Sequence, residues 1–214
     1  MQQHKTALIA GSTGLIGTQL LSLLLESPSY DKVIAVGRKA PEVSHPKLQS
    51  VVVDFNNVSS LNIPCDDVFC CLGTTIAVAG SQEKFREIDH DYPVALASQT
   101  LAAGAKGFYL VSAMGAASNS KIFYNRVKGD TETDIAQLGF SSAYFFRPSM
   151  LLGDRKAFRL GEKIGKAVMV GLDFLIPAKY KAVQAKQVAW CMLQEAQEPK
   201  LGVTVVENDA ILGA

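Results

Sequence analysis

Three glycines at intervals of three residues, directly after the first apolar run, constrain the fold more than any other feature of the chain. The run Lys5–Ala10 (KTALIA) predicts a buried strand, and the heptapeptide GSTGLIG that follows opens an apolar helix. Here Gly11 permits a tight turn, Gly14 lets the backbone approach a ligand, and Gly17 lets helix and strand pack closely. Free N–H groups and the positive end of the helix dipole favour a phosphate ligand. A purely structural turn is the alternative, but the order of strand, turn and helix favours the phosphate.

Short, Val-rich runs separated by helical stretches predict a parallel sheet. Each run is continuously apolar rather than alternating, which is typical of strands covered on both faces. Further strands are expected at 33–36, 50–53, 68–72, 108–112 and 143–147. Helices are expected at 15–25, at 81–103 with a kink near Pro93, and at 121–138, with Gly104 and Gly139 as C-caps. The predicted fold class is therefore α/β, a doubly wound parallel sheet of Rossmann type with right-handed crossovers.

The pattern changes after Pro148. We expect a helical insertion at 154–176, a helix at 181–197 and a last strand at 203–206. Since no linker rich in Pro, Gly or Ser precedes this part, we predict one domain, 1–214, in which 154–200 forms a small, mainly helical lobe for a substrate or partner. Four cations at helical spacing would line one face of that lobe, either as a solvated surface or to capture an acidic substrate or partner: Arg155, Arg159, Lys163 and Lys166.

The charge balance gives no reason to expect binding to nucleic acid or to a membrane surface. The 214 residues carry 21 Lys plus Arg against 20 Asp plus Glu, a formal net charge of +1. No apolar run approaches the roughly 18 to 20 residues of a membrane helix, and no cleavage site of a signal peptide follows the start. Four Cys without a CxxC pair and three widely separated His predict reduced thiols and no metal site. We therefore expect a cytoplasmic protein.

The end of the second strand bears on the choice of dinucleotide. An acidic residue there would hold a ribose 2′-hydroxyl and select NAD, but this chain has Arg38 and Lys39 instead. A guanidinium fork and an ammonium suit a 2′-phosphate, which favours NADP(H) over NAD(H), unless both are merely solvated loop charges. Asp54, which closes the third strand, could meet an adenine edge or simply form a turn.

A tyrosine and a lysine four residues apart suggest carbonyl chemistry. Tyr124 and Lys128 share one face of the helix predicted at 121–138. Reduction of a carbonyl needs a proton at oxygen as hydride reaches carbon, and a neighbouring ammonium favours the phenolate that a phenol leaves behind. The pair gains specificity from the glycine turn and from Ser112, which ends the fifth strand.

The motifs GSTGLIG, CLGTT from Cys71, LVSAMGA from Leu110, YNRVKGDTE from Tyr124 and RPSMLLGDR from Arg147 together resemble the atypical short-chain dehydrogenase/reductases. The resemblance covers nearly the whole chain. It implies that the diphosphate is bound by Gly11, Ser12, Thr13, Gly14, Leu15, Ile16 and Gly17. It also implies that Arg38 binds the 2′-phosphate, that Leu72, Gly73 and Thr74 line the cofactor, and that Pro148, Met150 and Leu151 meet the nicotinamide. Tyr124 would be the acid–base, and Lys128 its partner and a ligand of the nicotinamide ribose.

One departure from the family pattern leaves two functions open. Many members end the fifth strand with two serines, the second of which orients the carbonyl, whereas this chain has Ser112-Ala113. Either Ser112 takes that role or catalysis is weak. The Asn often found before that strand is replaced by Asp89-His90-Asp91, so a relay through such an Asn is not supported. We predict an NADP(H)-dependent oxidoreductase acting on a small carbonyl or alcohol, or alternatively a non-catalytic NADPH sensor that binds a protein partner.

Overall fold

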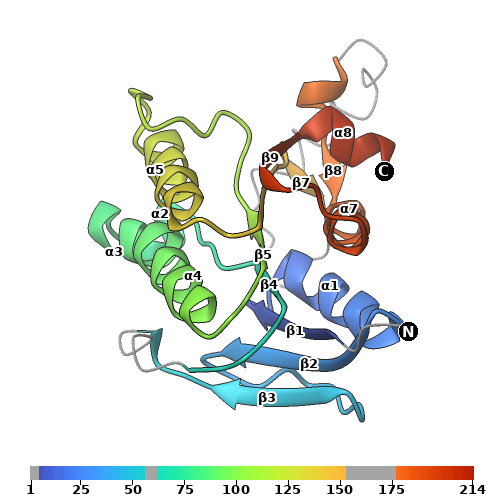
Figure 1. Ribbon diagram of the computed structural model, residues 1–214. Coiled ribbons are helices and arrows are strands. Elements are labelled where there is room, and N and C mark those ends of the chain that lie inside the picture. The colour runs from blue at the N-terminus through green and yellow to red at the C-terminus, as the bar shows by residue number, and fades with distance from the viewer. Residues whose placement is uncertain (1–4, 56–61, 153–176) are drawn as a thin grey trace.

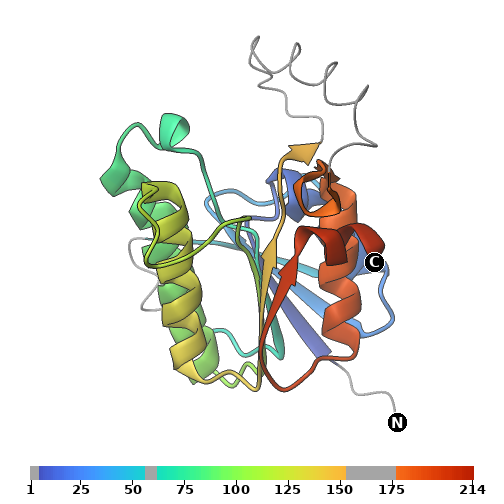
Figure 2. The same ribbon diagram turned by 90° about the horizontal axis from the view of Figure 1, so that it is seen from above.

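The computed structural model describes residues 5–55, 62–152 and 177–214 and contains a seven-stranded sheet in the order β3-β2-β1-β4-β5-β6-β9. Every neighbouring pair of strands is parallel. Figures 1 and 2 show this sheet as a central layer with helices on both sides. The predicted fold class is confirmed. The strands are β1 (Lys5–Ala10), β2 (Tyr30–Gly37), β3 (Leu48–Val52), β4 (Asp67–Cys70), β5 (Gly107–Val111), β6 (Ser142–Arg147) and β9 (Gly202–Glu207).

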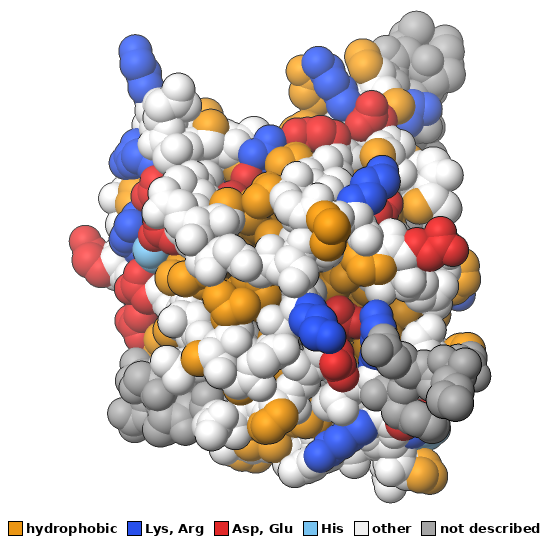
Figure 3. Space-filling view, viewed as in Figure 1, with side chains coloured by type: hydrophobic (Ala, Val, Ile, Leu, Met, Phe, Trp, Pro, Cys, Tyr) orange, Lys and Arg blue, Asp and Glu red, His pale blue; other side chains and the backbone are white. Residues whose placement is uncertain are grey.

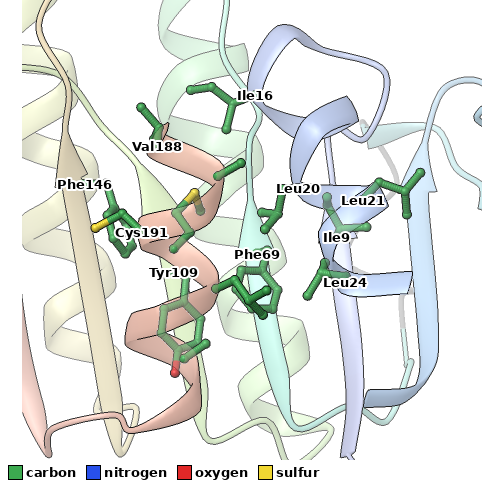
Figure 4. Packing of buried hydrophobic residues seen from close by; sticks show 14 of the residues in the cluster. Ile9, Ile16, Leu20, Leu21, Leu24, Phe69, Tyr109, Phe146, Val188 and Cys191 are labelled. Carbon is green, nitrogen blue, oxygen red and sulfur yellow. The ribbon is translucent and has the colours of Figure 1, made fainter. Parts of the chain in front are cut away.

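Two layers of apolar side chains fix the helices to the sheet. Helices α1 (Leu15–Glu26) and α7 (Ala185–Gln197) cover one face, where they bury Leu20, Val188 and neighbouring residues against Phe69. Figure 4 shows these side chains interdigitating between the two helices and the strands. The other face is covered by α4 (Tyr92–Ala102) and α5 (Phe123–Leu138). Because both faces are buried, the strands read as continuous apolar runs.

The helix expected at 81–103 is divided into three parts. α3 (Gln82–Arg86) leads into a π-helical turn, Glu87–Asp91, which continues into α4. Pro93 cannot donate a backbone hydrogen bond to the carbonyl of Asp89, four residues earlier. The hydroxyl of Thr131 on α5 donates to that carbonyl instead, at 2.9 Å. The irregularity therefore precedes the proline, and the carbonyl of Asp89, to which Pro93 cannot donate, accepts a hydrogen bond from the neighbouring helix.

The last part of the chain returns to the sheet. The helix expected from residue 181 begins at Ala185, because Gln184 and Gln187 form a capping box there. Of the lobe expected at 154–200, α7 packs on the same face of the sheet as α1 (Figure 2). Residues 153–176, which include the four cations of the expected stripe, lie outside the described residues. Short elements complete the chain: α2 (Ile76–Ala79), β7 (Leu151–Leu152), η4 (Ala178–Tyr180), β8 (Val183–Gln184) and α8 (Asn208–Gly213).

Charges of both signs are interspersed over the face drawn in Figure 3. Among the helices that the structure describes, none has the length and apolar character to cross a membrane. Since all seven strands run parallel, their carboxyl ends meet at one edge of the sheet, here called the carboxyl edge, and their amino ends at the other, the amino edge. In open α/β sheets ligands bind at the carboxyl edge, where the strand order reverses. Here that point lies between β1 and β4.

Candidate functional site at the carboxyl edge of the sheet

Most of the predicted site residues gather at the carboxyl edge because they follow the ends of strands. Gly11 follows β1, Arg38 follows β2, and Ser112 and Pro148 follow β5 and β6. The loop after β4 starts at Cys71, whose N–H donates to the carbonyl of Ala10 at 2.8 Å and so joins the turn after β1. Residues from five separate segments are thus brought to one edge.

The glycine turn after β1 has no room for a side chain at Gly11 or Gly17. A Cβ atom on Gly17 would lie 2.1 Å from the carbonyl oxygen of Gly11, and one on Gly11 would lie 2.6 Å from that of Cys71. Gly11 also has a φ of 83°, in the left-handed region that favours glycine. Gly14 is the N-cap of α1, where no side chain caps the helix and no acidic residue occupies the first turn. The first-turn N–H groups are therefore left without a side-chain acceptor.

The remaining residues of the turn divide between surface and core. Thr13 and Gly14 are exposed and Leu15 is half-buried. Ser12, Ile16 and Gly17 are buried against the sheet. The exposed part of the turn, rather than the whole heptapeptide, therefore offers backbone to a ligand.

The cations after β2 are accessible to solvent. Arg38 and Lys39 are exposed directly beyond the strand, and Asp54 is exposed just beyond the neighbouring β3. Because β2 and β3 pair up to Gly37 and Val52, these side chains start from the same corner of the carboxyl edge. A charged group entering this corner would meet two cations before it reached the protein interior.

A buried ion pair lies beneath the loop that follows β4. Lys128 Nζ on α5 lies 2.8 Å from Asp89 Oδ1 in the π-helical turn, with only 6% and 1% of the two side chains exposed. The other carboxylate oxygen of Asp89 accepts a hydrogen bond from the backbone N–H of Thr74 at 2.8 Å. A Cβ atom on Gly73 would lie 3.3 Å from Asp89 Oδ1 and 3.7 Å from Lys128 Nζ. The absence of a side chain at Gly73 keeps the backbone of this loop close to the ion pair.

The surroundings of Lys128 keep it charged. Burial alone lowers the pKa of its ammonium, but the Asp89 carboxylate, the nearby Tyr124 and Cys70 outweigh burial and hold the pKa above its ordinary value of 10.5. Lys128 thus keeps a full positive charge at the carboxyl edge, and Asp89 holds it there, because separating the two side chains would leave both charges buried and unpaired.

Tyr124 stands one helical turn before Lys128 on α5. Its side chain is half-buried, and its ring packs on Phe85 of α3 with a centroid distance of 5.3 Å. The helix thus places a phenol and an ammonium on one face, as their spacing predicted. Close packing below the pair comes from Gly129, where a Cβ atom would lie 2.2 Å from the backbone of Ala117.

Ser112 takes part in a different buried network. Its hydroxyl donates to Glu132 Oε1 at 2.5 Å. Arg147, at the end of β6, binds the same carboxylate with Nε and Nη2 and reaches Glu207 with Nη1 at 2.9 Å. The hydroxyl proton of Ser112 is therefore already used inside the protein, and the next residue, Ala113, has no hydroxyl.

The segment after β6 is tied to the C-terminal part of the chain. Asn208, fully buried at the start of α8, accepts a hydrogen bond from the N–H of Ser149 and donates to the carbonyls of Ala178 and Lys181. Pro148 is buried, Leu151 is half-buried in β7, and Met150 is exposed. This segment therefore presents only part of its surface beside the site.

Sequence reasoning missed Asp89 and Glu132 as site residues. Asp89 lies on the buried helical stripe of Phe85, Leu96 and Thr100, where a carboxylate requires a buried partner. That position was a usable signal. Glu132 likewise falls among the buried residues of α5. No cluster of three or more potential metal ligands occurs among the residues that the structure describes.

Comparison with known sequences gives relatives over most of the chain. The model of a protein family described as NAD(P)H-binding matches residues 11–136. Protein HTATIP2 of Rattus norvegicus is 34% identical over 218 residues, which cover 98% of this chain and 89% of the relative. Protein FMP52, mitochondrial, of Eremothecium gossypii is 35% identical over 79% of this chain and 76% of the relative. The expected cytoplasmic location is contradicted, because several fungal relatives are named as mitochondrial proteins.

Solved structures with low sequence identity share the fold. MoeE5 in complex with UDP-glucuronic acid and NAD superposes with a TM-score of 0.73 at 16% identity, covering 95% of this chain and 76% of that one. Human epimerase family protein SDR39U1 with NADPH gives a TM-score of 0.65 at 18% identity, covering 94% and 74%. The architecture of nicotinamide-dinucleotide proteins thus extends over the chain.

Proposed function

The chain belongs to the NAD(P)H-binding family, and on that premise we propose that it is an NADP(H)-dependent oxidoreductase that acts on a small carbonyl or alcohol at the carboxyl edge. The observation that carries the proposal is the buried, charged Lys128, which lies beside the backbone of Gly73 and one helical turn after Tyr124. Burying a lysine–aspartate pair is costly, and a fold gains little stability from it. A fixed ammonium next to a half-buried phenol is better explained by chemistry than by packing.

The shape of the glycine turn supports a dinucleotide ligand. At Gly11 and Gly17 a side chain would overlap backbone, and the first turn of α1 has no side-chain cap. Gly11 to Gly17 would hold the diphosphate, mainly through the exposed backbone of Thr13 and Gly14. Leu72, Gly73 and Thr74 would line the cofactor on the β4 side, and Pro148, Met150 and Leu151 on the β6 side.

The corner after β2 supports the phosphorylated form of the cofactor. Arg38 and Lys39 are exposed there with no carboxylate in the two positions that would select a ribose hydroxyl. Arg38 would bind the 2′-phosphate as a fork and Lys39 as a point charge. Asp54 would meet the adenine edge from the adjacent strand end.

The chemistry needs one proton and one hydride. When bound, the nicotinamide supplies the hydride to a carbonyl carbon, or accepts it from an alcohol. The Tyr124 hydroxyl would deliver its proton to the carbonyl oxygen, so that the carbonyl becomes an alcohol and Tyr124 a phenolate. Lys128, held charged by Asp89, would stabilise that phenolate and bind a ribose hydroxyl. Asp89 thus positions Lys128 rather than touching the substrate.

One observation favours a second candidate, a non-catalytic NADPH sensor that binds a protein partner. The Ser112 hydroxyl donates to Glu132, and Ala113 replaces the second serine of the family pattern. Neither side chain supplies a free hydroxyl to orient a carbonyl. Such a protein would bind NADPH with the same turn and the same cations but would not consume it.

The test combines binding with turnover. Calorimetric titration with NADPH and NADH should show NADPH bound about tenfold more tightly or better, because only its 2′-phosphate meets Arg38. A panel of small aldehydes and ketones, followed by NADPH absorbance, should then identify turnover. The Tyr124→Phe variant should lose about 10²- to 10⁴-fold in turnover with NADPH affinity nearly unchanged. Tyr180→Phe is the matched control, because Tyr180 is exposed and is not among the proposed site residues.

The outcomes separate the candidates. Absence of binding to either nucleotide would overturn both functions. Tight NADPH binding without consumption would favour the sensor. Turnover that survives Tyr124→Phe would show that another group delivers the proton.

A further inference from the structure

The edge strand β9 carries an exposed apolar row. Leu201, just before the strand, and Val203 and Val205 within it are 85%, 52% and 41% exposed, while Val206 is buried. Val206 is buried on the face covered by α1 and α7, so Val203 and Val205 point to the opposite face, beside their β6 register partners Ala143 and Phe145. Figure 2 shows β9 at the margin of the sheet, beyond β6. The row therefore continues the apolar surface of the α4–α5 face onto β9, the last strand of the described sheet.

The backbone of β9 has further hydrogen-bonding groups on the side of the strand that faces away from β6. The N–H of Gly202 donates to the carbonyl of Ser141 on the β6 side, at 2.9 Å. Because backbone groups alternate in direction along a strand, Thr204 and Val206 also face β6, while the N–H and C=O groups of Val203 and Val205 face outward. No described strand pairs with that side.

The strand lacks the features that usually prevent edge pairing. Between Gly202 and Glu207 there is no proline and no lysine, and the only charge is Glu207 at the end. Natural sheets commonly protect an edge with such residues, with bulges or with a covering element. A β-branched edge strand without proline or lysine is suited to receive another strand.

We propose that β9 pairs with β9 of a second copy of this chain, in antiparallel register about a two-fold axis at Thr204. In this register Val203 of each copy lies opposite Val205 of the other, and these are the residues whose backbone groups face outward. The pairing forms two hydrogen-bonded residue pairs and joins the valines of both copies into one row. Symmetric self-pairing of this kind closes as a dimer.

The charges at the ends of the strand favour the antiparallel arrangement of identical copies. Lys200 precedes the strand and Glu207 ends it, and both are exposed. Glu207 is bound by Arg147 of its own chain at 2.9 Å, yet 48% of its side chain remains exposed. Antiparallel pairing brings the end that carries Lys200 next to the partner's end that carries Glu207, whereas parallel pairing would place like charges together. The second copy is therefore complementary in backbone, apolar surface and charge.

The oligomeric state tests the proposal. Sedimentation equilibrium up to about 100 µM should give twice the chain mass of 23.0 kDa for the wild type. The double variant Val203→Lys/Val205→Lys should sediment as a monomer, because it places four like charges in the shared row. Val52→Lys is the matched control, since Val52 is 66% exposed on the opposite edge strand, β3, and should leave the dimer intact. A monomeric wild type, or a double variant that still dimerises, would overturn the proposal.

Cysteine cross-linking tests the register. In the proposed pair the two Thr204 Cα atoms lie about 4.5 Å apart, within disulfide range, while the two Val203 Cα atoms are about 7–8 Å apart. With oxidised glutathione, Thr204→Cys should form a covalent dimer, and Val203→Cys should do so several-fold less. Equal cross-linking of both variants, or none of Thr204→Cys, would rule out this register. The inference is independent of the proposed enzymatic function.

Discussion

Two buried aspartates, Asp89 and Asp67, lie at opposite edges of the sheet, and each is paired with a lysine. At the carboxyl edge Asp89 binds Lys128 at 2.8 Å, and both side chains are almost fully buried. At the amino edge Asp67 begins β4, binds Lys5 at 3.2 Å and accepts a hydrogen bond from the Tyr30 hydroxyl at 2.8 Å. Lys5 keeps 27% of its side chain exposed. The same residue types thus meet in two different environments.

The two pairs differ in how far their lysines are withdrawn from water. The amino-edge pair joins β1, β2 and β4 through a lysine that remains partly hydrated, so only its aspartate is withdrawn from water. The carboxyl-edge pair withdraws both charges from water, which costs several kcal/mol per ion before their attraction is counted. It ties α5 to the loop after β4, beside the proposed cofactor site. The costlier pair is the one beside the proposed chemistry.

Removal of each lysine should give the largest contrast. Lys128→Met leaves the buried Asp89 carboxylate without its cation and should lower the free energy of unfolding by about 3–5 kcal/mol. Lys5→Met should cost only about 1 kcal/mol, because the Tyr30 hydroxyl still binds Asp67 and Lys5 is partly hydrated. Urea unfolding of both variants measures the two losses.

A second substitution distinguishes lost charge from lost packing. In Lys128→Met/Asp89→Leu no charge remains buried, so most of the stability should return. Equal losses for Lys128→Met and Lys5→Met would mean that the two pairs do not differ as the burial of their lysines indicates.

Local sequence patterns were enough to predict the fold, the glycine turn and the common helix face of Tyr124 and Lys128. The strand–glycine–helix order, the continuous apolar strands and the four-residue spacing of Tyr124 and Lys128 all lie within short windows of sequence. Their structural consequences depend on backbone sterics and helix geometry, which a short segment determines by itself.

The contacts that complete the site join distant segments. Asp89 meets Lys128 only because the π-helical turn and α5 pack together, and Ser112 meets Glu132 only because β5 lies beneath α5. From the sequence, Asp89 was noted only as a departure from a family pattern. Its position among buried helical residues was the better indication that it has a buried partner. Such partners follow from tertiary packing, which no local window contains.

The pH dependence of stability should also distinguish the two edges. Burial raises the pKa of Asp67 above its ordinary value of 3.8, although Lys5 and Tyr30 act in the opposite direction. The folded protein therefore holds this proton more tightly than the unfolded chain does. The resulting stability is present below 3.8 and is lost as pH rises through the folded pKa. The raised pKa of Lys128 bears on stability only at pH above 10.5, far from this range.

Asp67→Asn isolates this effect. Relative to the variant, the wild type should lose free energy of unfolding as the pH rises from 3.8 to neutrality. Asp209→Asn, at an exposed position in α8, is the control and should show no such trend. A constant difference between wild type and Asp67→Asn across this range would contradict the assignment.

The smallest expected effect comes from the Tyr109 hydroxyl, close to the amino-edge pair. It is buried without a hydrogen-bond partner among the described residues, while its ring stacks on Phe69 and Tyr144 at 4.9 and 5.3 Å. Burial raises the pKa of Tyr109, so the hydroxyl keeps a proton that it cannot donate. Tyr109→Phe removes only this unsatisfied group and should leave stability unchanged or raise it by up to about 1 kcal/mol.

Tyr30→Phe provides the comparison, because the Tyr30 hydroxyl is bonded to Asp67 and its loss should cost about 1.5–3 kcal/mol. Urea unfolding at neutral pH separates the two substitutions, which delete the same atom from the same ring. If Tyr109→Phe destabilised the protein as much as Tyr30→Phe does, the Tyr109 hydroxyl would have to form a hydrogen bond that the structure does not show. The polar contacts at the amino edge would then include one besides those to Asp67. The two edges would then differ less in their buried polar contacts than the structure indicates.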